Sequence, residues 1–249
     1  MKCISVAIDG PSGAGKSTLA RKAAAILGYL YVDTGAIYRT VALSAVRRGI
    51  DPADAEGLVP TLNELDIRLE YAEDGLQHMY LNGEDVSQDI RVHEISQHAS
   101  TVSAIPSVRA FLLDLQRDLA RKNNVILDGR AIRTVVLPDA NVKIFLTASP
   151  ESRAQRRHLE LQQRGQDTDF DTVLRDIIRR DEQDTNRPIA PLRQAEDAVL
   201  VDTTHMDLEQ SLQALEEEKY AEQADNGDDG KELFHVDRTH QRKLFEIFC

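Results

Sequence analysis

The sequence predicts an α/β fold with a five-stranded, mostly parallel sheet as its core and helices on both sides. Strand-like and helix-like patterns alternate along the chain, and each strand candidate is short, apolar and followed by a polar or glycine-containing turn. The strand candidates are residues 4–8, 29–32, 125–127, 142–146 and 199–201. Alternation of this kind is typical of a parallel sheet.

The first strand candidate leads into a glycine-rich loop and then a helix. Residues 17–27 carry apolar side chains at helical spacing and end before Gly28. Between strand and helix, residues 10–17 read GPSGAGKS and match G-x-x-x-x-G-K-[ST] in full. Strand, loop and helix in this order are the context of a phosphate-binding P-loop, which makes a chance glycine loop the weaker interpretation.

The P-loop predicts ATP as a bound nucleotide and Mg²⁺ as its counterion. Small residues let backbone N–H groups converge on the phosphates, Lys16 neutralises phosphate charge, and the Ser17 hydroxyl is the candidate metal ligand, together with the ATP phosphates. The predicted ATP-binding residues are Gly10, Pro11, Ser12, Gly13, Ala14, Gly15, Lys16, Ser17 and Thr18.

Residues 62–90 interrupt the alternation. The segments IRLEY and HMYLN alternate in polarity and flank Glu73-Asp74-Gly75, which is a hairpin signal. A small antiparallel insertion is therefore predicted here.

Two further helices are expected after the fourth strand. The first begins at Ser149-Pro150-Glu151, with a capping residue and a proline in its first turn, and ends near Gly165. The second starts around Asp169, and its predicted buried residues are Val173, Leu174, Ile177 and Ile178.

Composition sets the broad class of protein. The chain holds 30 Lys and Arg against 42 Asp and Glu, a net charge of −12, so we expect no nucleic-acid partner. Only Cys3 and Cys249 are cysteines, which excludes a disulfide framework and favours a cytoplasmic location. No run of 18 apolar residues occurs, so we expect no membrane association.

The C-terminal stretch differs from the rest of the chain. Residues 216–229 hold seven acids against the single Lys219, and the following residues are rich in phenylalanine. We therefore separate a body, residues 1–222, from an acidic and then amphipathic tail, residues 223–249. A short helix in the tail and an unstructured extension are both open, and its partner is unknown.

The motif does not show whether the γ-phosphate is transferred to an acceptor, as in a kinase, or hydrolysed, as in a switch or motor. The guanine-reading run N-K-x-D of switches is absent. A kinase needs cations for its acceptor, and Arg180, Asp184 and Arg187 are spaced to share one helical face. A surface ion-pair ladder is the alternative for these three residues.

Other arginines also favour a kinase with a cationic acceptor site. Arg130 follows the strand at 125–127, and Arg39 lies at the same end of the predicted sheet, where open α/β sheets bind ligands. Arg153, Arg156 and Arg157 crowd one helix, for which a solvated face is the alternative.

No catalytic triad or carboxylate pair stands out. A phosphate acceptor is already ionised at neutral pH and needs charge neutralisation rather than a strong base. An alcohol acceptor would require an aspartate directed at its hydroxyl group, and Asp33 and Asp128 are the candidates for that role.

Several segments together resemble the bacterial cytidylate kinase family, in order and spacing, from about Ile4 to Tyr220. They are IDGPSGAGKST (8–18), VDTGAIYR (32–39), DGR (128–130), TVVLPDA (134–140), KIFLTAS (143–149), RAQRR (153–157) and RRDEQDTNRPIAPL (179–192). The resemblance implies phosphorylation of CMP and dCMP to CDP and dCDP by ATP, in a protein expected to be a monomer.

The resemblance also implies a P-loop core of residues 1–35, 105–150 and 188–222 with two mobile parts. An acceptor-binding part covers about residues 36–104, and a helical lid with its supporting helix covers about residues 150–187. The residues implied in acceptor binding are Thr34, Arg39, Ser100, Arg109, Arg130, Arg180, Asp184 and Arg187.

Within that set the resemblance implies particular roles. Arg39, Arg130 and Arg187 would bind the acceptor phosphate, and Asp184 would bind the ribose hydroxyls beside Arg180. Ser100 and Arg109 would face the cytosine edge. Arg153 and Arg157 of the lid would approach ATP. The implied catalytic cations are Lys16, Arg130, Arg153, Arg157 and Arg187.

The chain departs from the family after the DGR motif. Ala131 and Arg133 stand where the family has Asp and Gly, while Thr34 in place of the commoner Ser keeps the hydroxyl. Ala131 cannot accept a hydrogen bond from the cytosine amino group, and the Arg133 guanidinium either reads the base, points to solvent or contacts a phosphate. There are two alternatives. One is a kinase with a shifted acceptor such as UMP, and the other is a nucleotide-binding protein that has no turnover and acts through its tail.

Overall fold

Five parallel strands form the central sheet in the computed structural model, which describes residues 3–71, 77–163, 165–206 and 210. They lie in the order β2-β6-β1-β7-β8, and every neighbouring pair is parallel. The predicted fold class is confirmed, and each predicted strand overlaps an observed one. The strands are β1 (Ser5–Asp9), β2 (Leu30–Asp33), β6 (Val125–Gly129), β7 (Val142–Thr147) and β8 (Val199–Asp202).

The register of this sheet brings three aspartates to one end. Asp9 is the last residue of β1, and Asp33 at the end of β2 lies opposite Asp128 of β6. The carboxyl ends of parallel strands are where open α/β sheets bind ligands. Strand β6, which lies beside β1, and strand β2, which lies beside β6, thus add carboxylates to the end of the sheet at which the P-loop begins.

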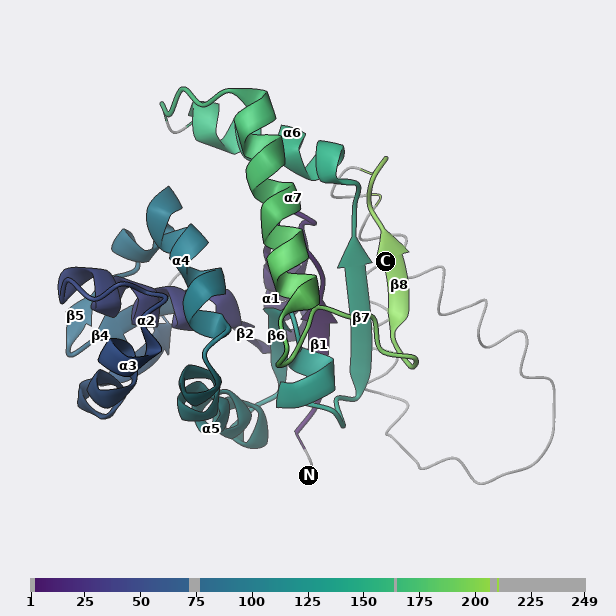
Figure 1. Ribbon diagram of the computed structural model, residues 1–249. Helices are drawn as coiled ribbons and strands as arrows, with labels where there is room; N and C mark the ends of the chain where they lie inside the picture. The colour runs from purple at the N-terminus through teal and green to yellow at the C-terminus, as the bar shows by residue number, and fades with distance from the viewer. Residues whose placement is uncertain (1–2, 72–76, 164, 207–209, 211–249) are drawn as a thin grey trace.

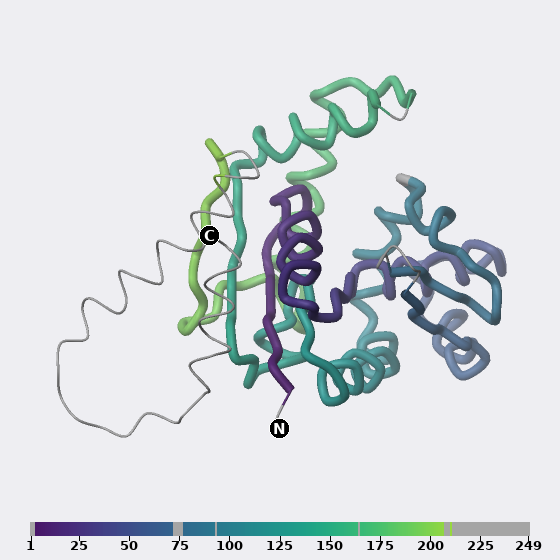
Figure 2. Tube along the Cα trace, turned by 180° about the vertical axis from the view of Figure 1, so that it is seen from behind, coloured from purple at the N-terminus to yellow at the C-terminus, as the bar shows by residue number. Residues whose placement is uncertain are grey.

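Helices cover both faces of the sheet. Helix α1 (Lys16–Leu27) lies on the face seen in Figure 2, and α7 (Phe170–Asn186) crosses the opposite face, in front in Figure 1. Side chains of β1 alternate between these layers: Val6 and Ile8 join the core formed with α1, and Ala7 joins the other. Helix α5 (Pro106–Lys122) packs on that second side.

A lobe of helices and short strands stands beside β2, at the left of Figure 1. Its antiparallel sheet has the order β3-β4-β5, which confirms the predicted insertion, while the predicted turn at 73–75 lies outside the described residues. The lobe consists of α2 (Thr34–Arg47), α3 (Ala55–Leu58), η1 (Val59–Glu64), β3 (Ile67–Tyr71), β4 (Gln77–Leu81), β5 (Glu84–Asp85), η2 (Asp89–Arg91) and α4 (His93–Ser103).

Two side-chain hydrogen bonds attach this lobe to the edge strand of the central sheet. The Tyr71 hydroxyl donates to the Tyr31 carbonyl oxygen at 2.6 Å, and the Gln77 side-chain oxygen accepts from the Asp33 N–H at 2.8 Å. The lobe is therefore held at β2, next to the end of the sheet that carries the aspartates.

The helix that follows β7 and the first turns of α7 project above the sheet (Figure 1). Helix α6 (Pro150–Gln163) and helix α7 pack through Ala154, Leu161, Val173 and Ile177, and Asp169 caps α7 by accepting from the Thr172 N–H at 3.1 Å. Leu174 is partly buried in the same cluster. The prediction that Ile178 is buried is wrong: it is 40% exposed, because the buried stripe of α7 is narrower than the sequence pattern indicates.

No helix among the described residues is long and apolar enough to cross a membrane. The predicted tail, residues 223–249, lies outside the described residues, as does its predicted helix.

Candidate active site

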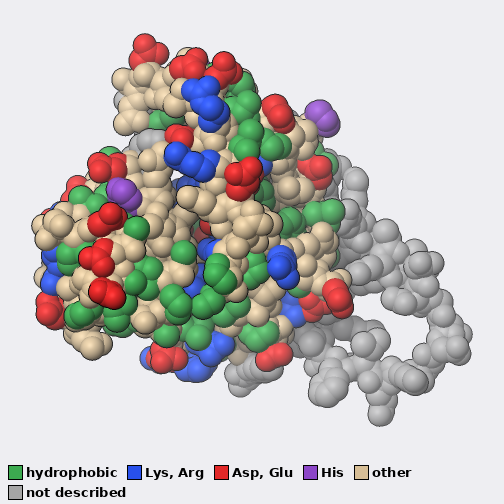
Figure 3. Space-filling view, in the orientation of Figure 1, with side chains coloured by type: hydrophobic (Ala, Val, Ile, Leu, Met, Phe, Trp, Pro, Cys, Tyr) green, Lys and Arg blue, Asp and Glu red, His purple; other side chains and the backbone are tan. Residues whose placement is uncertain are grey.

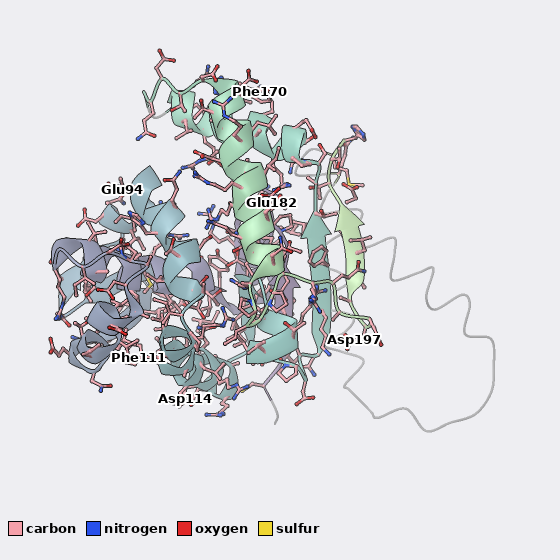
Figure 4. The ribbon with its side chains drawn as sticks, viewed as in Figure 1. Glu94, Phe111, Asp114, Phe170, Glu182 and Asp197 are labelled. Carbon is pink, nitrogen blue, oxygen red and sulfur yellow. The ribbon has the colours of Figure 1, made fainter. Side chains whose placement is uncertain are left out.

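A cavity of about 490 Å³ lies between the P-loop, α4, α5, α7 and the segment that follows β6. Figure 3 shows a hollow beside Lys and Arg side chains, and Figure 4 shows nitrogen-rich side chains between α4, near the labelled Glu94, and α7, near Glu182. Such a concentration of positive charge favours anionic ligands. The basic residues that line the cavity are Lys16, Arg39, Arg109, Arg130, Arg156, Arg157, Arg179, Arg180 and Arg187.

The P-loop forms one wall of this cavity. Gly10, Gly13 and Gly15 have φ values of +152°, +77° and +94°, which favour glycine. At Gly10, a Cβ atom would lie 1.9 Å from the Leu146 carbonyl oxygen, so a side chain there would displace the loop from β7. Helix α1 begins directly after Gly15, and its first N–H groups provide an anion site.

Lys16 is buried at the base of the loop. Its Nζ donates to the Pro11 carbonyl oxygen at 2.7 Å. Burial, with Arg130 nearby, lowers the pKa of Lys16 to about 7. A polyphosphate beside Nζ would favour the charged ammonium, so ligand binding and protonation of Lys16 are linked.

Ser17 is hydrogen-bonded to an aspartate that sequence reasoning treated only as a possible base. The Ser17 hydroxyl donates to Asp128 Oδ2 at 2.7 Å, and the Tyr31 hydroxyl donates to Oδ1 at 3.3 Å. Burial, with the Asp33 charge nearby, raises the pKa of Asp128 to about 6. The signal in the sequence was the position of Asp128 at the carboxyl end of a strand adjacent to the P-loop strand.

Asp184 organises the opposite wall. Its carboxylate lies 2.8 Å from Arg130 Nε and 3.7 Å from Arg187, and Ser100 Oγ is 3.5 Å away. Burial alone would raise the pKa of Asp184, but Arg130, Arg180 and Arg187 hold it below its usual range. An ionised Asp184 thus orders several cations around one point of the cavity.

Arg180 connects this wall to the P-loop. Its Nε donates to Ser100 Oγ at 3.0 Å and its NH1 donates to Ser12 Oγ at 3.3 Å. Burial and the neighbouring Arg130 lower the pKa of Arg180 to about 10. Arg180, Asp184 and Arg187, which were predicted to share one helical face, all line the cavity; the first two lie in α7, and Arg187 follows its last residue with extended backbone.

The remaining predicted acceptor residues lie around the same cavity. Arg39 pairs with Asp33 at 2.8 Å, and the Thr34 hydroxyl donates to the Asp128 carbonyl oxygen at 2.6 Å. Arg109 donates to the Ser103 carbonyl oxygen and stacks over Tyr38. The predicted acceptor set is therefore assembled from α2, α4, α5 and α7, with Arg130 directly after β6 and Arg187 directly after α7.

The two lid arginines are placed differently from each other. Arg157 lines the cavity and pairs with Glu160 at 3.1 Å. Arg153 is buried behind the P-loop, where it donates to the Ser12 carbonyl oxygen at 3.1 Å and pairs with Asp181 at 2.5 Å. An approach of Arg153 to ATP would require this ion pair to open.

The structure corrects the expectation for Arg133. Its side chain is fully buried, pairs with Asp9 at 3.1 Å and stacks over the Phe145 ring, so it neither reads a base, nor points to solvent, nor contacts a phosphate site. Ala131 does line the cavity, as expected. The π-helical segment η3 (Ile132–Val136) turns the residue after Ile132 away from the cavity.

A P-loop and a second cluster of cations that share one cavity define the chain as a P-loop kinase for an anionic acceptor. A family model described as cytidylate kinase matches residues 6–219. The chain belongs to the cytidylate kinase family.

Curated relatives agree with that assignment. The cytidylate kinase of Caldicellulosiruptor bescii is 49% identical over 215 residues, which cover 86% of this chain and 95% of the relative. That of Geobacter sp. strain M21 is 51% identical over 212 residues, covering 85% and 90%. Among solved structures, a gluconokinase from Sinorhizobium meliloti 1021 is similar with a TM-score of 0.43 and 17% identity, over 88% of this chain and 97% of its own. That score is too low to add to the assignment.

Proposed function

We propose that the chain transfers the γ-phosphoryl group of ATP to CMP and dCMP, yielding ADP with CDP or dCDP. Family membership supports the reaction. The observation that carries it is the division of one cavity into a P-loop wall with Lys16 and an opposite wall where Asp184 orders Arg130 and Arg187. Two phosphorylated substrates fit two cationic walls.

The P-loop wall would hold ATP. Ser17 and Asp128 suit a magnesium ion bound with the nucleotide, because they place a hydroxyl and a carboxylate oxygen 2.7 Å apart beside Lys16. When bound, the ion supplies charge neutralisation at the β- and γ-phosphates. Lys16 adds a second charge there in its protonated form.

The opposite wall would hold the nucleoside monophosphate. Arg39, Arg130 and Arg187 present guanidinium groups suited to a phosphate, which they bind with paired N–H donors. Asp184 accepts from the ribose hydroxyls, and Ser100 and Arg109 face the base. These residue roles follow the family pattern and are supported by the shared cavity.

The transfer needs positioning and charge neutralisation rather than a strong base. An oxygen of the acceptor phosphate forms the new bond to the γ-phosphorus while the bond to the ADP oxygen breaks, and the negative charge passes to ADP. Lys16, Arg130 and Arg187 lower the energy of the negative charge that the acceptor oxygen, the transferred phosphoryl group and the ADP oxygen share in the transition state.

The lobe beside β2 and the pair of helices α6 and α7 would supply the closure that such a transfer needs. Residues 36–104 would move with the acceptor, and residues 150–187 would close over ATP, excluding water. Arg157 already lines the cavity, whereas Arg153 would enter only after leaving Asp181. Cytoplasmic location and a monomeric state are expected from the sequence.

A coupled ADP-release assay with CMP, dCMP, UMP and AMP tests the proposal. We expect turnover with CMP and dCMP, and lower turnover with UMP and AMP. Turnover only with UMP or AMP would mean a shifted acceptor, and nucleotide binding without any turnover would contradict the proposal.

A further inference from the structure

Gln116 is a buried polar residue for which the described structure offers no hydrogen-bond partner. Its side chain is 1% exposed, and neither its amide oxygen nor its amide nitrogen makes a hydrogen bond. A buried amide without partners costs free energy, and such groups in native proteins call for an explanation. A ligand that supplies the missing partners is one explanation.

The position of Gln116 in α5 sharpens this point. Val108, Leu112 and Ala120 lie one or two turns away on the same helical face and are buried, so an apolar residue would suit position 116 better for packing alone. Phe111 and Asp114, labelled in Figure 4, mark where α5 lies in the molecule. A glutamine on the apolar face of a helix has no evident packing purpose.

The side chain also lies at the cavity. Gln116 lines it together with Ala131, Ile132 and Val136, on the side where α5 meets the segment after β6. The next residue holds the two elements together, since Arg117 donates to the Val135 carbonyl oxygen at 2.9 Å and to that of Val136 at 3.1 Å. The amide therefore lines the same cavity as Ala131, the position at which this chain lacks the family's carboxylate.

We propose that Gln116 reads the hydrogen-bonding edge of the acceptor's pyrimidine base. This inference rests on the proposed function, since it assigns the base of the same acceptor. The amide oxygen would accept from the amino group of cytosine while the amide NH₂ donates to the ring N3. Both unpaired atoms of Gln116 then gain partners in one contact.

The amide differs from a carboxylate in what it can tell apart. Turned over, the same group donates to the O4 carbonyl of uracil and accepts from its N3–H, whereas a carboxylate can only accept. With Ala131 unable to accept a hydrogen bond, a base reader of this kind recognises a pyrimidine but separates cytosine from uracil weakly. Relaxed selectivity is therefore built into this wall.

Gln116→Met tests the contact with a side chain of similar shape and no hydrogen-bonding groups. We expect kcat/KM for CMP and for UMP to fall about 10-fold or more, the loss expected for two neutral hydrogen bonds, mostly through KM. The KM for ATP should stay near the wild-type value. The melting temperature of the free variant should not fall, because the unpaired amide is removed.

Gln116→Glu separates reading from packing. A carboxylate keeps the size of the side chain and one acceptor but loses the donor that either base needs, for N3 of cytosine or for O4 of uracil, so kcat/KM should fall about 10-fold or more for both CMP and UMP. Gln97→Met is the matched control, because Gln97 lines the same cavity but bonds to Asp176, and its kcat/KM for CMP and for UMP should stay near the wild-type values.

The outcomes distinguish the two proposals. If the wild type turns over CMP and Gln116→Met leaves KM for CMP and for UMP unchanged, the base-reading role is overturned and the kinase function stands. If Gln116→Met instead lowers the melting temperature and weakens ATP and CMP equally, the residue is structural, which also overturns it. If the wild type neither binds nor turns over any pyrimidine monophosphate, both proposals fail.

Discussion

The Arg133 guanidinium lies 3.1 Å from the Asp9 carboxylate, and both side chains are fully buried. The same carboxylate accepts the backbone N–H groups of Ile132 at 2.8 Å and Arg133 at 3.1 Å. Asp9 directly precedes the P-loop glycine, and η3 directly follows Ala131. The ion pair therefore holds the cavity wall formed by Ala131 and Ile132 against the strand that carries the P-loop.

Arg133→Met should destabilise the protein, because it leaves a buried carboxylate without its cation. We expect a loss of about 3–5 kcal/mol in the free energy of unfolding at pH 8. Burial raises the pKa of Asp9. The contribution of Asp9 to the free energy of unfolding is therefore present at low pH and is lost as the pH rises through that raised pKa. The loss of stability caused by Arg133→Met should accordingly be smaller at pH 5 than at pH 8. Urea unfolding at the two pH values measures this.

Arg121→Met provides the surface control for that variant. Arg121 pairs with Asp118 on the surface and should change the free energy of unfolding by less than about 1 kcal/mol. A pH-independent loss in Arg133→Met would show that packing over Phe145, rather than the charge, matters.

Lys16→Ala should reduce kcat by about 10²-fold or more while the protein stays folded, because the side chain faces the phosphate site rather than the apolar core. Steady-state assays with saturating CMP and ATP, together with a melting curve, measure both effects. A variant that keeps more than about a tenth of the wild-type kcat would show that the donor site is assigned wrongly.

ATP binding should take up a proton at pH 8. In the free protein Lys16 has a pKa lowered to about 7 by burial and Arg130, so it is mostly neutral at that pH, and phosphate would restore its charge. Calorimetric titrations in two buffers of different ionisation enthalpy should give different binding enthalpies. Lys16→Arg, which stays charged, should give equal ones, and equal enthalpies for the wild type would contradict the prediction.

Asp184→Asn should raise the KM for CMP about 10-fold or more with little change in the KM for ATP. The asparagine keeps the size of the side chain but removes the charge that orders Arg130 and Arg187 and would accept from the ribose. Glu182→Gln makes the same chemical change on the exposed face of α7 and should have no effect. Equal weakening of both substrates would mark Asp184 as a structural residue.

Ala131→Asp should increase selectivity for cytosine. The new carboxylate accepts from the cytosine amino group, a charge-assisted hydrogen bond worth about 1.5–3 kcal/mol, so the CMP-to-UMP ratio of kcat/KM should rise roughly 10- to 150-fold. Assays of both acceptors with wild type and variant give this ratio. An unchanged ratio would mean that position 131 does not face the base.

Local patterns predicted most of the fold. Short apolar runs gave the strands, helical spacing gave α1, α6 and α7, and the complete P-loop motif placed Lys16 and Ser17 at a strand-to-helix junction. These features depend on neighbours in the chain. The exposure of Ile178 was missed because the width of the buried stripe depends on how α6 packs against α7.

Contacts between distant residues were not predictable in the same way. Arg133 and Asp9 are 124 positions apart, and Asp128 and Ser17 are 111 apart, so no local pattern links them. Gln116 lies in an ordinary amphipathic helix, and only the structure shows that its amide has no hydrogen-bond partner among the described residues. Long-range pairing of polar groups was the part that the sequence left open.

The attachment of the lobe to β2 has a consequence for solubility. An edge strand with free N–H and C=O groups is a template for aggregation, and β2 is an edge of the central sheet. Here Tyr71 occupies the Tyr31 carbonyl oxygen and Gln77 occupies the Asp33 N–H, so the lobe shields that edge from a foreign strand. Loosening the lobe would expose the edge of β2 to pairing with another chain and would disturb the proposed acceptor site at the same time. One contact surface therefore affects both aggregation and turnover.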